Sequence, residues 1–115
     1  MASFRSELKR GTIELILLKL LEKEDMYGYR IVASLEERGG DVFRVKEGTL
    51  YPVLYRLEDN GFIDSYRSNP KRGVPRKYYK LTEAGSAQLK QLLDEWKKFA
   101  SVIDGLISNV EKENE

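Results

Sequence analysis

An apolar stripe near the C-terminus, too long for a small domain to cover, most constrains how this chain folds. From Leu89 onward, apolar residues recur at intervals of three and four, the spacing of one face of a helix. A helix of roughly 30 residues runs about 45 Å. A chain of 115 residues cannot bury such a helix along its whole length, so we expect a second copy of the chain to cover it. The stripe consists of Leu89, Leu92, Leu93, Trp96, Phe99, Ala100, Ile103, Leu106, Ile107 and Val110.

Two further helices and a short strand are predicted upstream. Apolar spacing indicates a first helix over residues 12–24, which begins at residues 11–12 unless it continues upstream through residues 4–10. A second helix runs from residues 27–29 to the pair Gly39-Gly40, which is typical of a helix end. We expect residues 43–45 to form a short strand.

The third predicted helix contains a proline. Leu50, Val53, Leu54 and Leu57 share one face, and Asn60-Gly61 ends the helix. Proline is tolerated in the first turn of a helix but not in its interior. We therefore expect the helix to begin within a few residues before Pro52.

After Gly61 the apolar period becomes that of strands. Residues 62–67 and 76–81 read as a hairpin with a long tip, and Thr82 is a candidate N-cap for the last helix. This order predicts a mainly α fold with a minor β component, a winged helix-turn-helix with a long C-terminal dimerisation helix. Residues 1–81 form the predicted DNA-binding domain, and residues 82–115 form the dimerisation helix and a short acidic tail.

The composition argues against catalysis. The chain has no cysteine and no histidine, which removes disulfides, thiolate and imidazole metal ligands and the usual nucleophile–base pairs. We predict no enzyme activity, no catalytic residue, no metal and no cofactor. The N-terminus lacks the apolar core of a signal peptide, and the run Leu15–Leu18 is stopped by Lys19, so we predict a soluble, cytoplasmic protein with no membrane partner.

Positive charge is concentrated in the predicted hairpin. The net charge is only +1, yet residues 65–81 carry six basic residues and no acidic one. Such a segment is typical of a surface that meets the phosphates of nucleic acid, although it is also typical of a solvated edge hairpin or of a module that docks an acidic protein. We predict that Lys71 and Arg72 at the tip contact DNA. Strand alternation sends Arg76 and Lys77 to opposite faces, so we expect one of them to meet DNA.

The outer faces of the third helix carry a second candidate surface. Residues at the N-terminal end of a recognition helix reach base edges in the major groove. The methyl group of Thr49 and the ring of Pro52 suit thymine methyls, and Lys46 and Arg56 suit phosphates. Tyr51 and Tyr55 either reach the DNA or pack against a neighbouring element.

These segments together resemble the PadR family of regulators. The resemblance rests on residues 48–58 (GTLYPVLYRLE), with support at 61–63, Gly73, 76–79, 81–85, 11–15 and 27–29, and it covers nearly the whole chain. The single helix after the hairpin resembles the family's shorter branch. The resemblance implies a homodimer held by the first and last helices, operator DNA as partner through residues 49–56 and the wing, and repression that a small aromatic or cationic compound often relieves.

Trp96 sits midway along the apolar stripe, where two copies would approach a twofold axis. Its indole, with Phe99, Ala100, Leu8 and Leu15, is a candidate wall for a flat effector, as some members of the family that the chain resembles have at this position. The alternative is that Trp96 anchors the interface without a ligand. The predicted dimer interface consists of Leu17, Leu89, Leu92, Leu93, Trp96, Ile103, Leu106, Ile107 and Val110.

Overall fold

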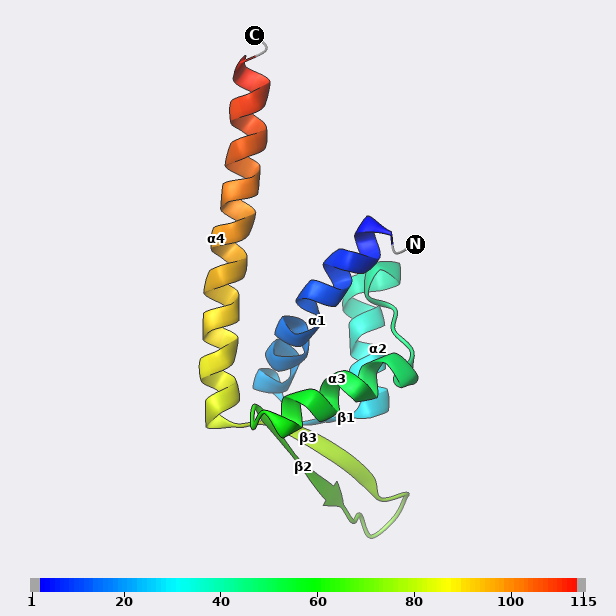
Figure 1. Ribbon diagram of the computed structural model, residues 1–115. Coiled ribbons are helices and arrows are strands. Elements are labelled where there is room, and N and C mark those ends of the chain that lie inside the picture. Colours follow the sequence, from blue (N-terminus) through cyan, green and yellow to red (C-terminus); the bar gives the residue numbers. More distant parts are fainter. Residues whose placement is uncertain (1–2, 114–115) are drawn as a thin grey trace.

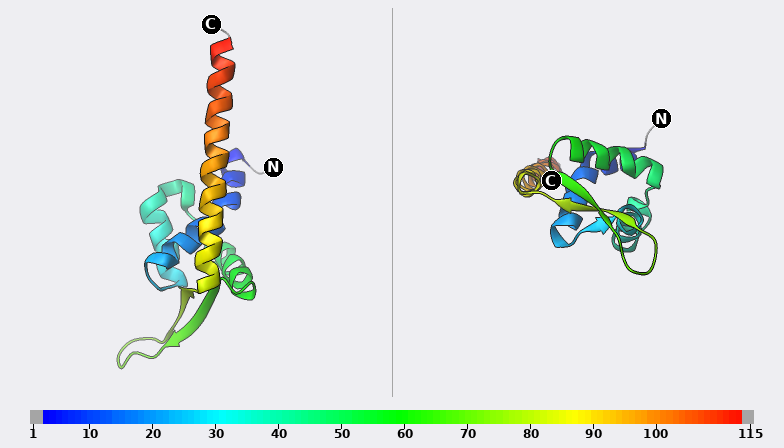
Figure 2. Two further views of the ribbon diagram at one scale, coloured as in Figure 1. Left: turned by 90° about the vertical axis from the view of Figure 1, so that its left-hand side faces the viewer. Right: turned by 90° about the horizontal axis from the view of Figure 1, so that it is seen from below.

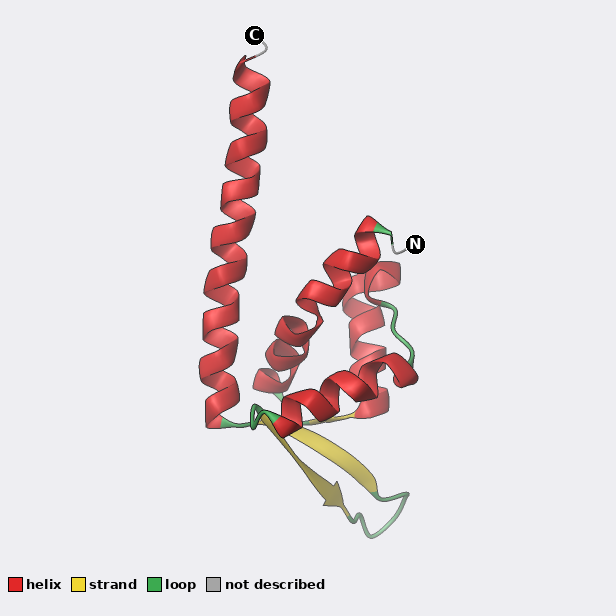
Figure 3. Ribbon diagram, in the orientation of Figure 1, coloured by secondary structure: helices red, strands yellow, loops and turns green. Residues whose placement is uncertain are grey.

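The computed structural model describes residues 3–113, in which a hairpin and a long helix project in opposite directions from a body formed by the first three α-helices (Figure 1). The body is mostly helical and the hairpin is its main β element (Figure 3). The long axis of the molecule measures 68 Å, because the C-terminal half of the last helix extends beyond the rest of the chain (Figure 2). In chain order the elements are α1 (Phe4–Lys23), β1 (Met26–Tyr27), α2 (Gly28–Gly39), the 3-10 turn η1 (Gly40–Phe43), α3 (Glu47–Asp59), β2 (Ile63–Ser68), β3 (Arg76–Leu81) and α4 (Glu83–Glu113).

The first helix is longer than its apolar core pattern. Ser3 caps it, with its hydroxyl oxygen accepting a hydrogen bond from the backbone N–H of Ser6 at 3.1 Å. The helix then runs without interruption through Gly11 to Lys23. The upstream continuation is therefore confirmed, and the alternative start at residues 11–12 is wrong.

The predicted strand at residues 43–45 is wrong. Gly40 takes a positive φ of 57° directly after α2, and the chain closes into η1. Phe43 and Val45 are half-buried and pack against the core as single side chains. Within the described residues the third strand is instead β1, which pairs antiparallel with β3 through Met26–Tyr79 and Tyr27–Tyr78, in the sheet order β1-β3-β2.

Helix α3 begins at Glu47, which places Pro52 in the second turn rather than the first. Proline has no N–H to donate to the carbonyl of Gly48, but Gly48 is exposed and that carbonyl can contact solvent. The inward stripe is as expected, with Leu50, Leu54 and Leu57 almost fully buried.

The core lies where α1, α2, α3 and the sheet meet. Leu17, Leu18 and Ile31 are fully buried there, together with Ile63 at the start of β2. The first turns of α4 pack against α1, and Leu89 belongs to the same core. Beyond Leu93 the large apolar residues of α4 are exposed.

Three backbone and side-chain bonds from Thr82 fix the start of α4. Its hydroxyl oxygen accepts from the N–H of Gly85 at 3.0 Å and its O–H donates to the carbonyl of Gly61 at 2.6 Å. Its backbone N–H donates to the carbonyl of Phe62 at 3.1 Å. The predicted N-cap is confirmed, and it ties α4 to the turn that ends α3.

We predict that Gly85→Ala destabilises the protein, because a Cβ at this position would overlap the carbonyl oxygen of Phe62. The free energy of unfolding should fall by about 3 kcal/mol in urea titration, as overpacking against backbone does. Gly105→Ala is the matched control in the same helix, since nothing lies within 4 Å of its Cβ. This control should gain roughly 0.5 to 1 kcal/mol from helix propensity. Equal effects of the two substitutions would contradict the close contact.

Candidate nucleic-acid interface

Helix α3 presents an exposed outer face. Because Leu50, Leu54 and Leu57 point into the core, Thr49, Pro52 and Tyr55 point outward. Lys46, also exposed, stands at the N-cap position of the helix. The predicted recognition residues therefore share the outer surface of one helix, next to the hairpin (Figure 1).

The hairpin is the wing. Its strands pair from Ile63–Leu81 to Ser68–Arg76, and the loop beyond them carries Lys71 and Arg72, both exposed. Gly73 in this loop has a φ of 100°, a conformation that favours glycine. The loop between β2 and β3 is the part of the wing farthest from α4 (Figure 2).

The two basic residues that begin β3 approach the same pocket. The guanidinium of Arg76 lies 4.3 Å from the ring centre of Tyr27. The Nζ of Lys77 lies 5.6 Å from the ring centre of Tyr55 and 3.9 Å from Oε1 of Glu58. Both basic residues line a pocket of about 440 Å³ beside α3. They do so although neighbouring residues of a strand point to opposite faces of the sheet.

Of the two tyrosines of α3, Tyr51 packs against a neighbouring element, and contact of either tyrosine with DNA stays a prediction. Tyr51 is half-buried and stacks on Tyr55 with ring centres 6.1 Å apart, whereas Tyr55 remains half exposed. Burial raises the pKa of Tyr51, and Glu47 and Tyr55 raise it further. The Tyr51 hydroxyl lies so close to Gly28 that a Cβ there would overlap it.

Sequence reasoning missed three tyrosines of this pocket. Tyr27 ends β1, Tyr29 lies in the first turn of α2, and Tyr79 comes from β3. The segment of residues 27–29 indicated only a helix start, and the strand pattern indicated only that Tyr79 alternates with its neighbours. Burial raises the pKa of Tyr79 to about 12, with smaller contributions from Tyr55, Tyr51 and Glu58.

Arg56 is engaged within the chain. Its Nη2 lies 2.6 Å from Oε1 of Glu14, and its Nε donates to the same oxygen at 2.8 Å. The contact joins α3 to α1. A phosphate contact by Arg56 therefore has to share the guanidinium with Glu14 or displace that carboxylate.

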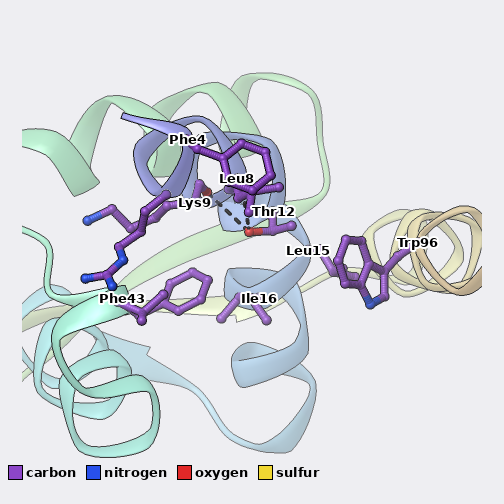
Figure 4. Close-up of a pocket in the computed structure, with 10 residues that line it drawn as sticks. Phe4, Leu8, Lys9, Thr12, Leu15, Ile16, Phe43 and Trp96 are labelled. Carbon is purple, nitrogen blue, oxygen red and sulfur yellow. Dashed lines mark hydrogen bonds between the residues drawn. The ribbon is translucent and has the colours of Figure 1, made fainter. Parts of the chain in front are cut away.

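An apolar groove of about 500 Å³ lies along α1, between η1 and Trp96 of α4 (Figure 4). Leu8, Leu15 and Trp96 line it as predicted, joined by Phe4, Ile16 and Phe43. The indole of Trp96 lies beside Leu15 (Figure 4). Phe99 and Ala100 do not line the groove; Phe99 is exposed and Ala100 is half-buried farther along α4.

The predicted dimer residues fall into three groups. Leu17 and Leu89 are buried to 0% and 1% exposure in the core of a single chain, so they offer no surface to a partner. Their placement at an interface was a misreading of core positions. Leu92 and Leu93 are half-buried. The remaining residues are exposed along α4, namely Trp96, Ile103, Leu106, Ile107 and Val110.

Within residues 3–113, no cluster of acidic side chains has the geometry to hold a metal ion. Nor does any helix in that part of the chain combine the length and apolarity needed to cross a membrane.

Comparison with known proteins decides the family. The model of the transcriptional regulator PadR-like family matches residues 17–91, from the second half of α1 to the first turns of α4. The chain belongs to the PadR-like family. Its members regulate transcription and are not enzymes, and membership implies DNA as the partner.

Individual relatives support this assignment. The chain is 37% identical to an uncharacterised protein of Lysinibacillus sphaericus over 93% of this chain and 98% of that one. It is 34% identical to the negative transcriptional regulator PadR of Bacillus subtilis, over 70% of this chain but only 42% of that longer protein. A transcriptional regulator from Clostridium thermocellum has a similar structure, with a TM-score of 0.78 and 36% identity over 86% of this chain and 96% of that chain.

Proposed function

We propose that the chain acts as a homodimeric repressor that binds operator DNA through α3 and the wing and is released by a small planar effector. One observation carries this proposal: the DNA-contacting candidates and the unpaired apolar stripe of α4 lie at opposite ends of the molecule (Figure 1). A second copy therefore covers the stripe and leaves α3 and the wing free. In this arrangement residues 1–81 bind DNA and residues 82–115 hold the two copies together.

The proposed DNA contacts divide by chemistry. Thr49 and Pro52 on the outer face of α3 suit thymine methyl groups and read base edges. Tyrosine and basic side chains bind the backbone and set orientation. The backbone group comprises Lys46, Tyr51, Tyr55, Arg56, Lys71, Arg72, Arg76 and Lys77, of which Arg56 competes with its own ion pair to Glu14.

Enrichment of genomic fragments on the purified protein, beginning with its own promoter, tests the function. We expect a short duplex with two half-sites about 34 Å apart, one helical turn of DNA. Arg72→Ala should lower affinity for all duplexes and reduce the slope of log K against log salt by about one. The control Lys98→Ala removes an exposed charge of the same sign on α4 and should leave affinity within about twofold, because salt screens distant charges.

A complex that is insensitive to salt would contradict the proposed phosphate contacts of the wing. Absence of binding to any duplex, random sequence included, would contradict DNA binding by this chain and favour a protein partner for the basic hairpin.

The dimer rests on the exposed part of α4. Six large apolar residues along one side of the helix each keep 39% to 63% of their surface exposed. They are Trp96, Phe99, Ile103, Leu106, Ile107 and Val110. A contiguous exposed apolar surface of this kind on a single chain marks a site of contact with another protein. Isologous pairing of the two stripes is the simplest closed arrangement.

We predict that Ile107→Glu converts the dimer to a monomer. Burying a carboxylate of each copy in the apolar contact costs several kcal/mol. Sedimentation velocity should show half the mass, and operator affinity should fall steeply because only one half-site is held at a time. Ser108→Glu places the same charge on the next, exposed residue and away from the stripe, and it should leave both measurements unchanged. A wild-type chain that sediments as a monomer would overturn the dimer.

The name of a relative supports repression, and the apolar groove supports release by an effector. The similar protein of Bacillus subtilis carries the name negative transcriptional regulator. The groove along α1 is apolar, about 500 Å³ in volume, and bordered by Trp96 of α4. Drug-sized ligands occupy sites of this volume.

Trp96 provides a direct assay of the groove, because it is the single tryptophan of the chain. We predict that a planar aromatic compound from a screening panel quenches its fluorescence and weakens binding to the recovered operator. Leu8→Asp, which puts a charge into the groove wall, should abolish quenching by that compound but not by iodide. If no compound quenches Trp96, the residue is an interface anchor only.

A further inference from the structure

The pocket between α2, α3 and the wing differs in chemistry from the apolar groove. It has a volume of about 440 Å³ and is walled by aromatic rings from four elements. Tyr27 ends β1, Tyr29 lies in the first turn of α2, and Tyr51 and Tyr55 come from α3. The remaining wall is β3, which supplies Tyr79 and the cations Arg76 and Lys77.

Several tyrosine hydroxyls of this pocket have no acceptor among the described side chains, and those of Tyr51 and Tyr79 are open to solvent. Tyr79 is buried to 1% exposure yet reaches the pocket. The side-chain hydrogen bonds formed nearby by described residues join Arg56 to Glu14, Ser65 to Glu58 and Tyr66 to Asp25, and none of them uses the hydroxyl of Tyr51, Tyr55 or Tyr79. Because the pKa of Tyr79 is raised to about 12 and that of Tyr51 is also raised, both phenols are protonated donors near neutral pH.

The charges of the pocket are positive. Arg76 and Lys77 line it, and no lining residue carries a carboxylate. Two carboxylates lie just outside the lining: Glu58, which is 3.9 Å from the Nζ of Lys77 and accepts a hydrogen bond from Ser65, and Glu47, which raises the pKa of Tyr51. Helix α2 also begins here without a side-chain cap, so the N–H groups of its first turn add positive potential.

Gly28 allows the side chain of Tyr51 in α3 to lie against the start of α2. A Cβ there would overlap the hydroxyl of Tyr51, so any larger residue would displace the Tyr51 side chain from the start of α2. The tyrosine hydroxyls and the cations thus meet in one place because the residue before Tyr29 is glycine.

We propose that this pocket holds one phosphodiester group of the DNA backbone. The inference rests on the proposed binding of DNA and adds Tyr27, Tyr29 and Tyr79 to it. A phosphodiester is an anion whose non-bridging oxygens only accept hydrogen bonds, which matches protonated phenols beside Arg76 and Lys77. A nucleobase fits less well, since it would have to leave the duplex and its edge presents donors to a pocket of donors.

Its place between the outer face of α3 and the wing gives the pocket a role. A phosphate fixed there sets how α3 enters the major groove while base edges are read elsewhere on the helix. In this role the pocket sets the register of the protein on the duplex and contributes to affinity for every DNA sequence alike.

The test uses the operator recovered by genomic enrichment, with neutral methylphosphonate linkages placed one at a time along each strand. For the wild-type chain, we expect neutral linkages to lower affinity at several positions in each half-site, because other cationic side chains also contact phosphates, and the linkage at the pocket to lower it about tenfold. Tyr79→Phe should lower affinity for unmodified operator by about tenfold, the loss expected for one hydrogen bond to a charged group. At the linkage in the pocket the two changes should be less than additive, because they remove the same contact.

Tyr78→Phe is the matched control, since it removes a hydroxyl from the neighbouring residue of β3 and keeps the rings that contact Tyr27 and Tyr66. It should leave affinity unchanged at every linkage. Tyr79→Phe should also leave the salt slope unchanged, whereas Lys77→Gln should reduce it by about one.

If Tyr79→Phe and the neutral linkages act additively at all positions while the wild-type chain still binds operator, the pocket is not a phosphodiester site although the regulatory function stands. If no duplex is bound at all, the proposed function itself has failed. Titration with inorganic phosphate tests whether the pocket binds a free anion instead. If millimolar phosphate shifts the tyrosine absorbance of the wild-type chain and the linkage effects are additive, the pocket is a site for a free anion. That result would overturn the DNA contact.

Discussion

The burial of one face of α3 is the constraint on which the rest of the structure depends. Leu50, Leu54 and Leu57 are nearly inaccessible to solvent, and removing each from water contributes roughly 1.5 to 3 kcal/mol. With this face fixed, helical geometry leaves Thr49 and Pro52 outside and sends Tyr51 toward α2. The exposed outer face of α3 and the tyrosine pocket thus both follow from the burial of the same face of α3.

Helix α1 links the regions that the proposed function requires. On one side it holds α3 at both ends: the Nζ of Lys9 donates to the carbonyl of Arg44 just before α3, at 3.1 Å, and Glu14 pairs with Arg56 near its end. On another side Leu15 and Ile16 line the apolar groove. A rigid shift of α1 therefore has to carry both contacts to α3 with it or break them, which gives a ligand in the groove a physical route to the DNA surface.

Sequence periodicity predicted the elements that are long and amphipathic, and it failed where structure depends on distant partners. The stripe of α3, the hairpin and the N-cap at Thr82 were all foreseeable from local patterns. Strand β1 was not, because two residues cannot show alternation and Met26 is extended by pairing with Tyr79. The same limit hid Tyr27, Tyr29 and Tyr79 as partners of Tyr51. Leu17 was misread because a helix that is apolar on several sides does not show which side its own domain covers.

The junction between wing and last helix has a role beyond stability. Thr82 bonds α4 to the turn after α3, and Gly85 lets α4 approach the carbonyl of Phe62. From that junction α4 continues as one helix to Glu113. In the proposed homodimer, the direction of α4 relative to α3 then determines how far apart the two recognition helices lie. In that dimer we expect the spacing between half-sites to depend on residues that touch no DNA, because a small change of angle at Gly85 is magnified along the length of the helix.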